Sequence, residues 1–178
     1  MQTNLYSTTI VPMMRSLEAL SKILNKAVAF AAAKKTERHD FTDALMNDRL
    51  VFDQHPFVRQ VQIACDNGKA AAARLSGLEP PSMPDTEKTF GELQARIQKT
   101  LEYMRAVPES SVTGRESETI PTPNLVARYG VETLSGYEYA VNYILPNFYF
   151  HVATAYDICR KNGVPLGKSD YLGALPLK

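Results

Sequence analysis

The sequence predicts an all-α protein, a four-helix bundle with a short hairpin or irregular insert between the third and fourth helices. Four stretches carry apolar residues at steps of three and four, which places those residues on one face of a helix. The chain has 178 residues, 44% of them apolar, which is enough to bury a core. It shows no internal repeat and no low-complexity tract, so we expect residues 1–178 to form a single domain.

The first helix is expected over residues 9–35. Pro12 lies near its start, where the missing backbone N–H costs little. A polar connection follows over residues 36–54, in which we expect at most a short helix, over Thr42–Arg49. The apolar stripe of the first helix consists of Ile10, Met13, Leu17, Leu20, Leu24, Ala27 and Ala31.

The second helix is expected over residues 56–76, with Pro56 in its first turn and Gly77 just after its end. Its apolar stripe includes small residues that would let another helix approach closely: Val58, Val61, Cys65, Gly68, Ala72 and Leu75. A polar stripe runs beside it and consists of His55, Arg59, Gln62, Asp66 and Lys69.

Asp66 in this polar stripe has two interpretations. In the first, it forms a surface ion pair with Lys69, worth about 0.3–0.5 kcal/mol. In the second, Asp66 and Gln62 turn inward, towards the fourth helix, and belong to a buried polar site. The sequence by itself slightly favours the surface ion pair.

A proline-rich loop over residues 78–88 leads into the third helix. Thr89 and Glu92 match a capping box, in which the two side chains bind each other's backbone N–H groups. Pro108 ends this helix. Its core stripe consists of Phe90, Leu93, Ile97, Leu101 and Met104.

The segment between the third and fourth helices, residues 108–134, is irregular. Pro121 and Pro123 argue against a central strand. Glu118–Ile120 and Val126–Val131 are nevertheless suited to pair as a short exposed hairpin. Because this insert joins two helices, we expect it at one end of the bundle.

The fourth helix is expected over residues 136–163 and should face the middle of the bundle. Ser135 is suited to cap its first turn, and Gly163 to end it. Pro146 lies inside it and predicts a kink near Tyr143–Pro146. Its apolar stripe consists of Val141, Leu145, Phe148, Val152, Ala155 and Cys159.

A second stripe of the fourth helix is polar in its middle. Asn147 and His151 are one turn apart and point the same way. Tyr143, Thr154 and Ile158 continue the stripe on either side. His151 is the one histidine on a strongly apolar stretch, which makes this stripe the candidate functional site.

The tail over residues 164–178 is too rich in glycine and proline for a helix. We expect three of its apolar side chains to pack back onto the body of the protein: Tyr171, Leu172 and Leu175.

Composition excludes several classes of protein. The net charge is +1, from 20 basic and 19 acidic residues without a basic run, so we expect no nucleic-acid partner. No apolar run is long enough to span a membrane, and the N-terminus lacks the pattern of a signal peptide, so we expect a cytoplasmic protein without membrane contact. Cys65 and Cys159 fall on apolar helix faces, which predicts buried thiols rather than a disulfide.

Known catalytic motifs are missing as well. The sequence has no G-x-S-x-G, P-loop or G-x-G-x-x-G motif. Cys159 lies eight residues after His151, more than two helical turns, so the two do not form a nucleophile and base pair.

Three segments carry a resemblance to a known family: QVQIACDNGKAAAARLSG, FGELQARIQKTLEYM and PNFYFHVATAYDICRKNGVPLGKSDYLG. They resemble an uncharacterised, domain-of-unknown-function family within the DinB/YfiT-like four-helix-bundle superfamily. The resemblance covers nearly the whole chain, and the last segment is the most specific. It implies a DinB-like bundle.

The resemblance also implies a position for a divalent metal. In the superfamily, three histidines typically hold the ion, one from helix two and two from an H-x-x-x-H turn in helix four. Here Asn147 and His151 occupy that turn, and Asp66 falls about where the helix-two ligand would be. Asn is a poor ligand for zinc or nickel, so the position is degenerate. The three residues would either hold a harder ion or form a hydrogen-bonded cluster with neighbouring polar side chains.

Two functions follow from this resemblance. In the first, the protein binds a small molecule in a polar pocket between helices two and four, at Asp66, Asn147 and His151. The other lining residues would be Gln62, Tyr143, Tyr149 and Thr154. Relatives include thiol-dependent transferases and isomerases, which is the most specific activity that the resemblance implies. In the second, the protein is a non-catalytic structural or interaction module with a vestigial site. A homodimer is expected in either case.

Overall fold

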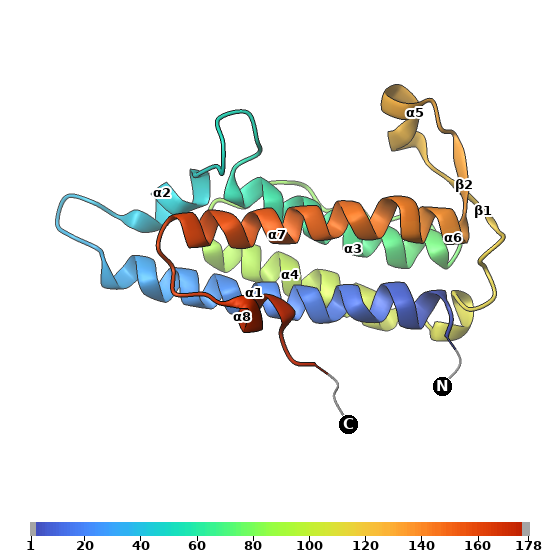
Figure 1. Cartoon of the computed structure of the whole chain (residues 1–178), viewed down its shortest axis with the longest axis horizontal. Coiled ribbons are helices and arrows are strands. Elements are labelled where there is room, and N and C mark those ends of the chain that lie inside the picture. Colours follow the sequence, from blue (N-terminus) through green and yellow to red (C-terminus); the bar gives the residue numbers. More distant parts are fainter. Residues whose placement is uncertain (1–2, 176–178) are drawn as a thin grey trace.

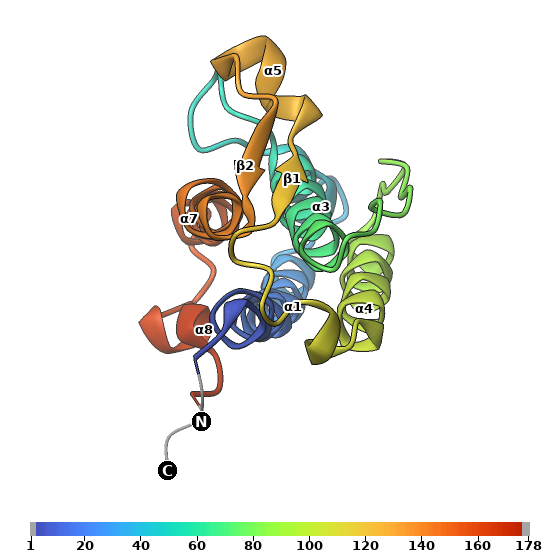
Figure 2. The same cartoon turned by 90° about the vertical axis from the view of Figure 1, so that its right-hand side faces the viewer.

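Four long helices lie side by side along the length of the molecule in the computed structural model, which describes residues 3–175 (Figure 1). They are α1 (Val11–Ala33), α3 (Phe57–Leu75), α4 (Phe90–Ala106) and α7 (Leu145–Lys161). Seen end-on, α3 lies between α4 and α7, and α1 lies across from it (Figure 2). The predicted all-α four-helix bundle is therefore confirmed. No helix within residues 3–175 is both long and apolar enough to cross a membrane.

The N-terminal part of the bundle follows the predicted pattern with shifted ends. A π-helical segment, η1 (Tyr6–Ile10), precedes α1, so the helix begins earlier than residue 9. The short helix expected after it is α2 (Phe41–Asn47), and the Asp40 side chain caps it by accepting a hydrogen bond from the backbone N–H of Thr42. The connection therefore contains one structured turn where the chain crosses to α3.

α3 buries side chains on two faces because it packs against both α4 and α7. Gly68 allows the close approach that its small residues predicted. A Cβ atom at Gly68 would lie 3.0 Å from the Met104 sulfur and 3.2 Å from Leu17 Cδ1. α4 begins with the predicted capping box, since the side chains and backbone N–H groups of Thr89 and Glu92 bind each other.

The predicted fourth helix consists of three consecutive segments. They are α6 (Gly136–Glu138), the π-helical η3 (Tyr139–Ile144) and α7. Where a kink was predicted near Tyr143–Pro146, the helix has this π-helical turn, which ends two residues before the proline. A proline cannot supply the backbone N–H that an α-helical turn needs, and a widened turn relieves the clash with the preceding carbonyl. The turn brings Tyr139 into the core, where its side chain is fully buried.

The insert differs from the predicted hairpin. β1 (Thr119–Pro121) pairs antiparallel with β2 (Thr133–Ser135), and Ile120 lies opposite Leu134. The helix α5 (Pro123–Tyr129) replaces most of the expected strand Val126–Val131, so that part of the prediction was wrong. Pro123 starts α5, and Gly130 ends it at a φ of 66°, which favours glycine. After Val107 a short 3₁₀ turn, η2 (Glu109–Ser111), leads into this segment. β1, β2 and α5 lie at one end of the bundle, as expected (Figure 1).

The tail contains a short helix that the sequence prediction excluded. α8 (Lys168–Leu172) begins where the Asp170 carboxylate accepts a hydrogen bond from the backbone N–H of Gly167 at 2.9 Å. Asp170 also pairs with Lys26 of α1 at 2.7 Å. These local contacts outweigh the glycine-rich composition. Tyr171 packs back onto the body as predicted, and its ring lies against Tyr156 with the centroids 5.8 Å apart. Leu172 and Leu175 were predicted to pack in the same way but are exposed.

Candidate functional site

The residues predicted to form one site are involved in contacts on different faces of α3. Oδ1 of Asp66 accepts a hydrogen bond from Arg96 of α4 at 2.7 Å and forms an ion pair with Lys69 at 2.8 Å. Asn147 and His151 of α7 contact two other residues of α3. The predicted ion pair between Asp66 and Lys69 is present, but Arg96 extends it into a larger network.

The α3 partners of Asn147 and His151 are Asn67 and Gln60. Nδ2 of Asn147 donates to Oδ1 of Asn67 at 3.0 Å. Nδ1 of His151 lies 2.7 Å from Oε1 of Gln60, whose Nε2 donates to the backbone carbonyl of His55 at 3.0 Å. Since Oε1 can only accept, Nδ1 of His151 carries the hydrogen. The two pairs form the polar part of the contact between α3 and α7.

His151 is neutral at physiological pH. Its pKa is lowered to about 4 because burial disfavours the charged imidazolium, and the positive charges of His55 and Arg59 add to this effect. The neutral ring presents Nε2 as an acceptor, while Nδ1 stays bound to Gln60. The environment of His151 therefore favours a hydrogen-bonding role over a charged one.

These residues do not fit the three-histidine metal centre that the resemblance implies. Asp66 and His151 were expected as ligands, but the Asp66 carboxylate binds Arg96 and Lys69. The partners that face Asn147 and His151 are carboxamides, which are weak donors for zinc or nickel. Among residues 3–175, no three His, Cys, Asp or Glu side chains are placed to hold an ion together.

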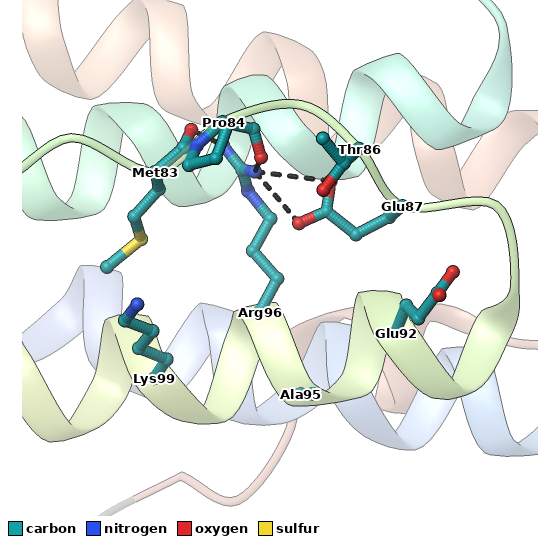
Figure 3. A pocket seen from close by; sticks show the side chains of 8 residues that line it. All are labelled: Met83, Pro84, Thr86, Glu87, Glu92, Ala95, Arg96 and Lys99. Carbon is teal, nitrogen blue, oxygen red and sulfur yellow. Dashed lines mark hydrogen bonds and ion pairs between the residues drawn. The ribbon is translucent and has the colours of Figure 1, made fainter.

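Arg96 is the buried centre of an ionic network that joins α3, α4 and the proline-rich loop over residues 78–88. Only 2% of its side chain is exposed. Besides Asp66, it binds Asp85 at 2.9 Å and Glu87 at 3.0 Å. It also donates to the backbone carbonyls of Met83 and Pro84 in the loop (Figure 3). The guanidinium thus fastens the loop across the two helices.

Gln62 belongs to this network and not to a pocket beside His151. Its Nε2 donates to Glu87 at 2.8 Å. Burial alone would raise the pKa of Glu87, but the hydrogen bonds from Arg96 and Gln62 outweigh burial and the pKa is lowered. A groove of about 330 Å³ lies between the loop and α4, where Arg96 rises from the helix towards the loop (Figure 3).

A second cavity lies between α3 and η3, with a volume of about 180 Å³. It contains two of the predicted site residues, Asp66 and Tyr143, and none of Asn147, His151, Tyr149 and Thr154. Thr154 donates instead to the backbone carbonyl of Phe150 in its own helix. The full lining consists of Asp66, Asn67, Lys69, Ala70, Arg74, Pro80, Asn124, Tyr139, Tyr143 and Ile144.

Two buried polar groups in the wall of this cavity have no hydrogen-bond partner within the described residues. They are the Tyr139 hydroxyl and Nδ2 of Asn67. Burial raises the pKa of Tyr139 to about 12, and the Arg74 guanidinium, through its positive charge and its approach to the hydroxyl oxygen, offsets only part of that effect. The hydroxyl is therefore a neutral donor. Unpaired buried groups of this kind are rare in proteins. Because two of them line the same cavity, this cavity is the candidate site.

Three residues of this cavity were not predicted from the sequence: Asn67, Arg74 and Tyr139. A signal was present, because Asn67, Ala70 and Arg74 follow at steps of three and four and share one face of a helix. The signal of this face is weak, since its middle residue is an alanine and Asn67 directly follows the more prominent Asp66.

The sequence matches one family of proteins. A family model described as a domain of unknown function, DUF1993, matches residues 5–172. The chain belongs to the DUF1993 family. No curated protein matches its sequence.

This DUF1993 protein is also similar to a crystal structure of a DinB family member protein from Shewanella denitrificans. The sequences are 43% identical, the match covers 98% of this chain and 94% of the other, and the TM-score is 0.86. The likeness confirms the DinB-like bundle and the predicted relation to an uncharacterised DinB-like family.

Proposed function

We propose that this DUF1993 protein binds a small polar molecule in the cavity of about 180 Å³ between α3 and η3. The observation that carries the proposal is the pair of unpaired buried donors, Tyr139 and Asn67. A buried polar group without a partner costs about 1–3 kcal/mol. A phenylalanine at position 139 would fill the same space without that cost. A bound molecule with acceptor atoms would give both donors a partner.

The size of the cavity supports a small occupant. A protein cavity of about 150 Å³ is large enough for benzene. The cavity between α3 and η3 has a similar volume, with apolar wall residues, Ala70, Pro80 and Ile144, beside the polar ones. A few well-placed polar groups in a partly apolar wall are typical of small-molecule sites.

The experiment combines ligand screening with a hydroxyl deletion. Thermal unfolding is followed in the presence of a panel of small carboxylic acids, amides, amines and alcohols, for the wild type and for Tyr139→Phe. We expect one class to raise the Tm of the wild type, since a ligand at 100 times its Kd adds about 2.7 kcal/mol. Tyr139→Phe should lose this shift. Tyr129→Phe, at an exposed position of α5, is the matched control and should keep it.

Without ligand, Tyr139→Phe should be at least as stable as the wild type, because it removes an unpaired buried hydroxyl. A loss of stability would mean that the hydroxyl has a structural partner, and it would count against the proposal. A panel that shifts neither protein, or shifts both equally, would overturn it.

The alternative is a non-catalytic structural or interaction module. The observation in its favour is that Tyr137, Val141 and Phe150, on the helix from α6 to α7, are exposed. A homodimer remains a prediction, and sedimentation of the wild type measures it directly. A dimer that forms equally well in Tyr139→Phe, together with a panel without hits, would favour this alternative.

A further inference from the structure

We infer that the cavity between α3 and η3 selects a small monocarboxylate, whose carboxylate contacts Arg74, Tyr139 and Asn67. This inference rests on the proposed function, because it names the ligand class of the same cavity. It follows from three features of the wall: its net charge, its hydrogen-bond donors and its volume.

No acidic side chain around the cavity pairs with the positive charge of Arg74. The neighbouring ionic network contains three acids, Asp66, Asp85 and Glu87, and three bases, Arg59, Lys69 and Arg96, and is therefore neutral. Lys69 lines the cavity but is held by Asp66 at 2.8 Å. Arg74 forms no ion pair within residues 3–175.

The charges on the other side of Arg74 do not neutralise it. Arg74 also lines a neighbouring cavity of about 240 Å³, together with Glu79 and Arg115. Glu79 is exposed, so solvent screens its charge. Arg115 lies 3.9 Å from the exposed Glu118. The half-buried guanidinium of Arg74 therefore gives the wall a positive charge, which favours an anionic ligand.

The unpaired groups of the wall can all donate a hydrogen bond. The Tyr139 hydroxyl and Nδ2 of Asn67 lack acceptors. A guanidinium has only donors, arranged as a planar fork. The Asp66 carboxylate, by contrast, is occupied by Arg96 and Lys69. A carboxylate provides about four acceptor positions and matches the guanidinium fork, so it offers enough acceptors for all three groups.

The volume limits the rest of the ligand. About 180 Å³ is close to the size of a cavity that holds benzene, so about six to eight non-hydrogen atoms fit. Ala70, Pro80 and Ile144 form an apolar part of the wall that suits a short hydrocarbon body. The cavity is too small for a nucleotide.

The test uses pairs of probes that differ only in charge. Isothermal titration is carried out with butanoate, 3-methylbutanoate and hexanoate, with their primary amides, and with inorganic phosphate. We expect at least one carboxylate to bind the wild type at least tenfold more tightly than its amide and than phosphate. Equal binding of carboxylate and amide, or of carboxylate and phosphate, would overturn the inference, as would the absence of binding for all three carboxylates.

Variants then test whether Arg74 and Tyr139 bind the carboxylate. Arg74→Gln and Tyr139→Phe should each weaken carboxylate binding at least tenfold. Arg38→Gln, which removes an exposed charge from the loop after α1, should leave it unchanged. Arg74→Lys keeps the charge without the fork and should bind with intermediate affinity. Circular dichroism checks that each variant is folded, and unchanged binding by folded Arg74→Gln would overturn the inference.

Failure of this inference is distinguishable from failure of the proposed function. If neutral compounds bind in a manner that depends on Tyr139 but not on Arg74, the cavity is a ligand site and the carboxylate assignment is wrong. If no compound of the panel or of the carboxylate series binds, both are wrong.

Discussion

Nδ1 of His151 and Oε1 of Gln60 lie 2.7 Å apart in the buried contact between α7 and α3. Gln60 is held in turn by the backbone carbonyl of His55. The histidine that looked like a metal ligand is therefore an ordered hydrogen-bond donor. Its neutral form is part of the folded structure, and this has a consequence for stability at acidic pH.

Acidification from pH 6.5 should destabilise the protein through His151. Its pKa is about 4 in the folded state and about 6.5 in the unfolded chain, so between these values only the unfolded state binds the proton. Stability should therefore fall as pH falls through this window, by up to about 1.4 kcal/mol per pH unit. Urea denaturation at pH 5 and pH 7 measures the difference. In His151→Gln the difference should shrink, and an identical difference in the variant would contradict this explanation.

Replacement of Arg96 should destabilise the fold more than any loss of a surface ion pair. Arg96→Met keeps most of the apolar stem but leaves Asp66, Asp85 and Glu87 without their common partner. Removing one partner of a fully buried pair costs about 3–5 kcal/mol, but Asp66 and Asp85 are partly exposed and keep Lys69 and Arg59, so we expect a loss of about 2–4 kcal/mol. Urea denaturation of Arg96→Met should show a loss of this size.

The matched control for Arg96 is Arg105→Met. Arg105 pairs with Glu18 at 2.6 Å, but both side chains are nearly half exposed. Such a pair contributes about 0–1 kcal/mol. Equal losses in the two variants would mean that the network around Arg96 is not a special source of stability.

Gly136, directly after β2, should not tolerate a side chain. A Cβ atom there would lie 2.1 Å from the backbone carbonyl oxygen of Arg115. Gly136→Ala must shift the backbone at the start of α6, at a cost of about 1–3 kcal/mol. Gly91→Ala in the first turn of α4 is the control, because a Cβ atom at Gly91 would have no neighbour closer than 3.9 Å. This substitution should stabilise the protein by about 0.4–1 kcal/mol. Thermal unfolding of both variants should give Tm changes of opposite sign.

Neither cysteine should react with iodoacetamide in the native protein at pH 8. Burial raises the pKa of Cys65 and of Cys159 to about 12, so almost no thiolate is present, and both side chains are fully buried. Mass spectrometry should find no alkylated protein under native conditions and two modified thiols in urea. Rapid labelling of one thiol in the native state would show that the helix carrying it opens locally.

The sequence by itself determined the bundle. Helix positions followed from the spacing of apolar residues, and the start of α4 followed from Thr89 and Glu92, because these signals act within one or two turns. The buried thiols were predicted from the same spacing. The short segments were less predictable. α5 replaced most of a predicted strand because Pro123 starts a helix and Gly130 ends it. α8 formed where none was expected because the Asp170 carboxylate caps its first turn.

Only the tertiary structure decided the partners of the site residues. Asp66 and Asn67 are neighbours in the chain, but one residue turns a helix by about 100°, so Asp66 binds Arg96 while Asn67 binds Asn147. α3 packs between α4 and α7, and polar residues on two of its faces are buried. Periodicity identifies buried faces but not the helix that each face meets. The cavity at Tyr139 has the same origin, because it lies where α3, η3, α5 and the proline-rich loop come together from distant parts of the chain.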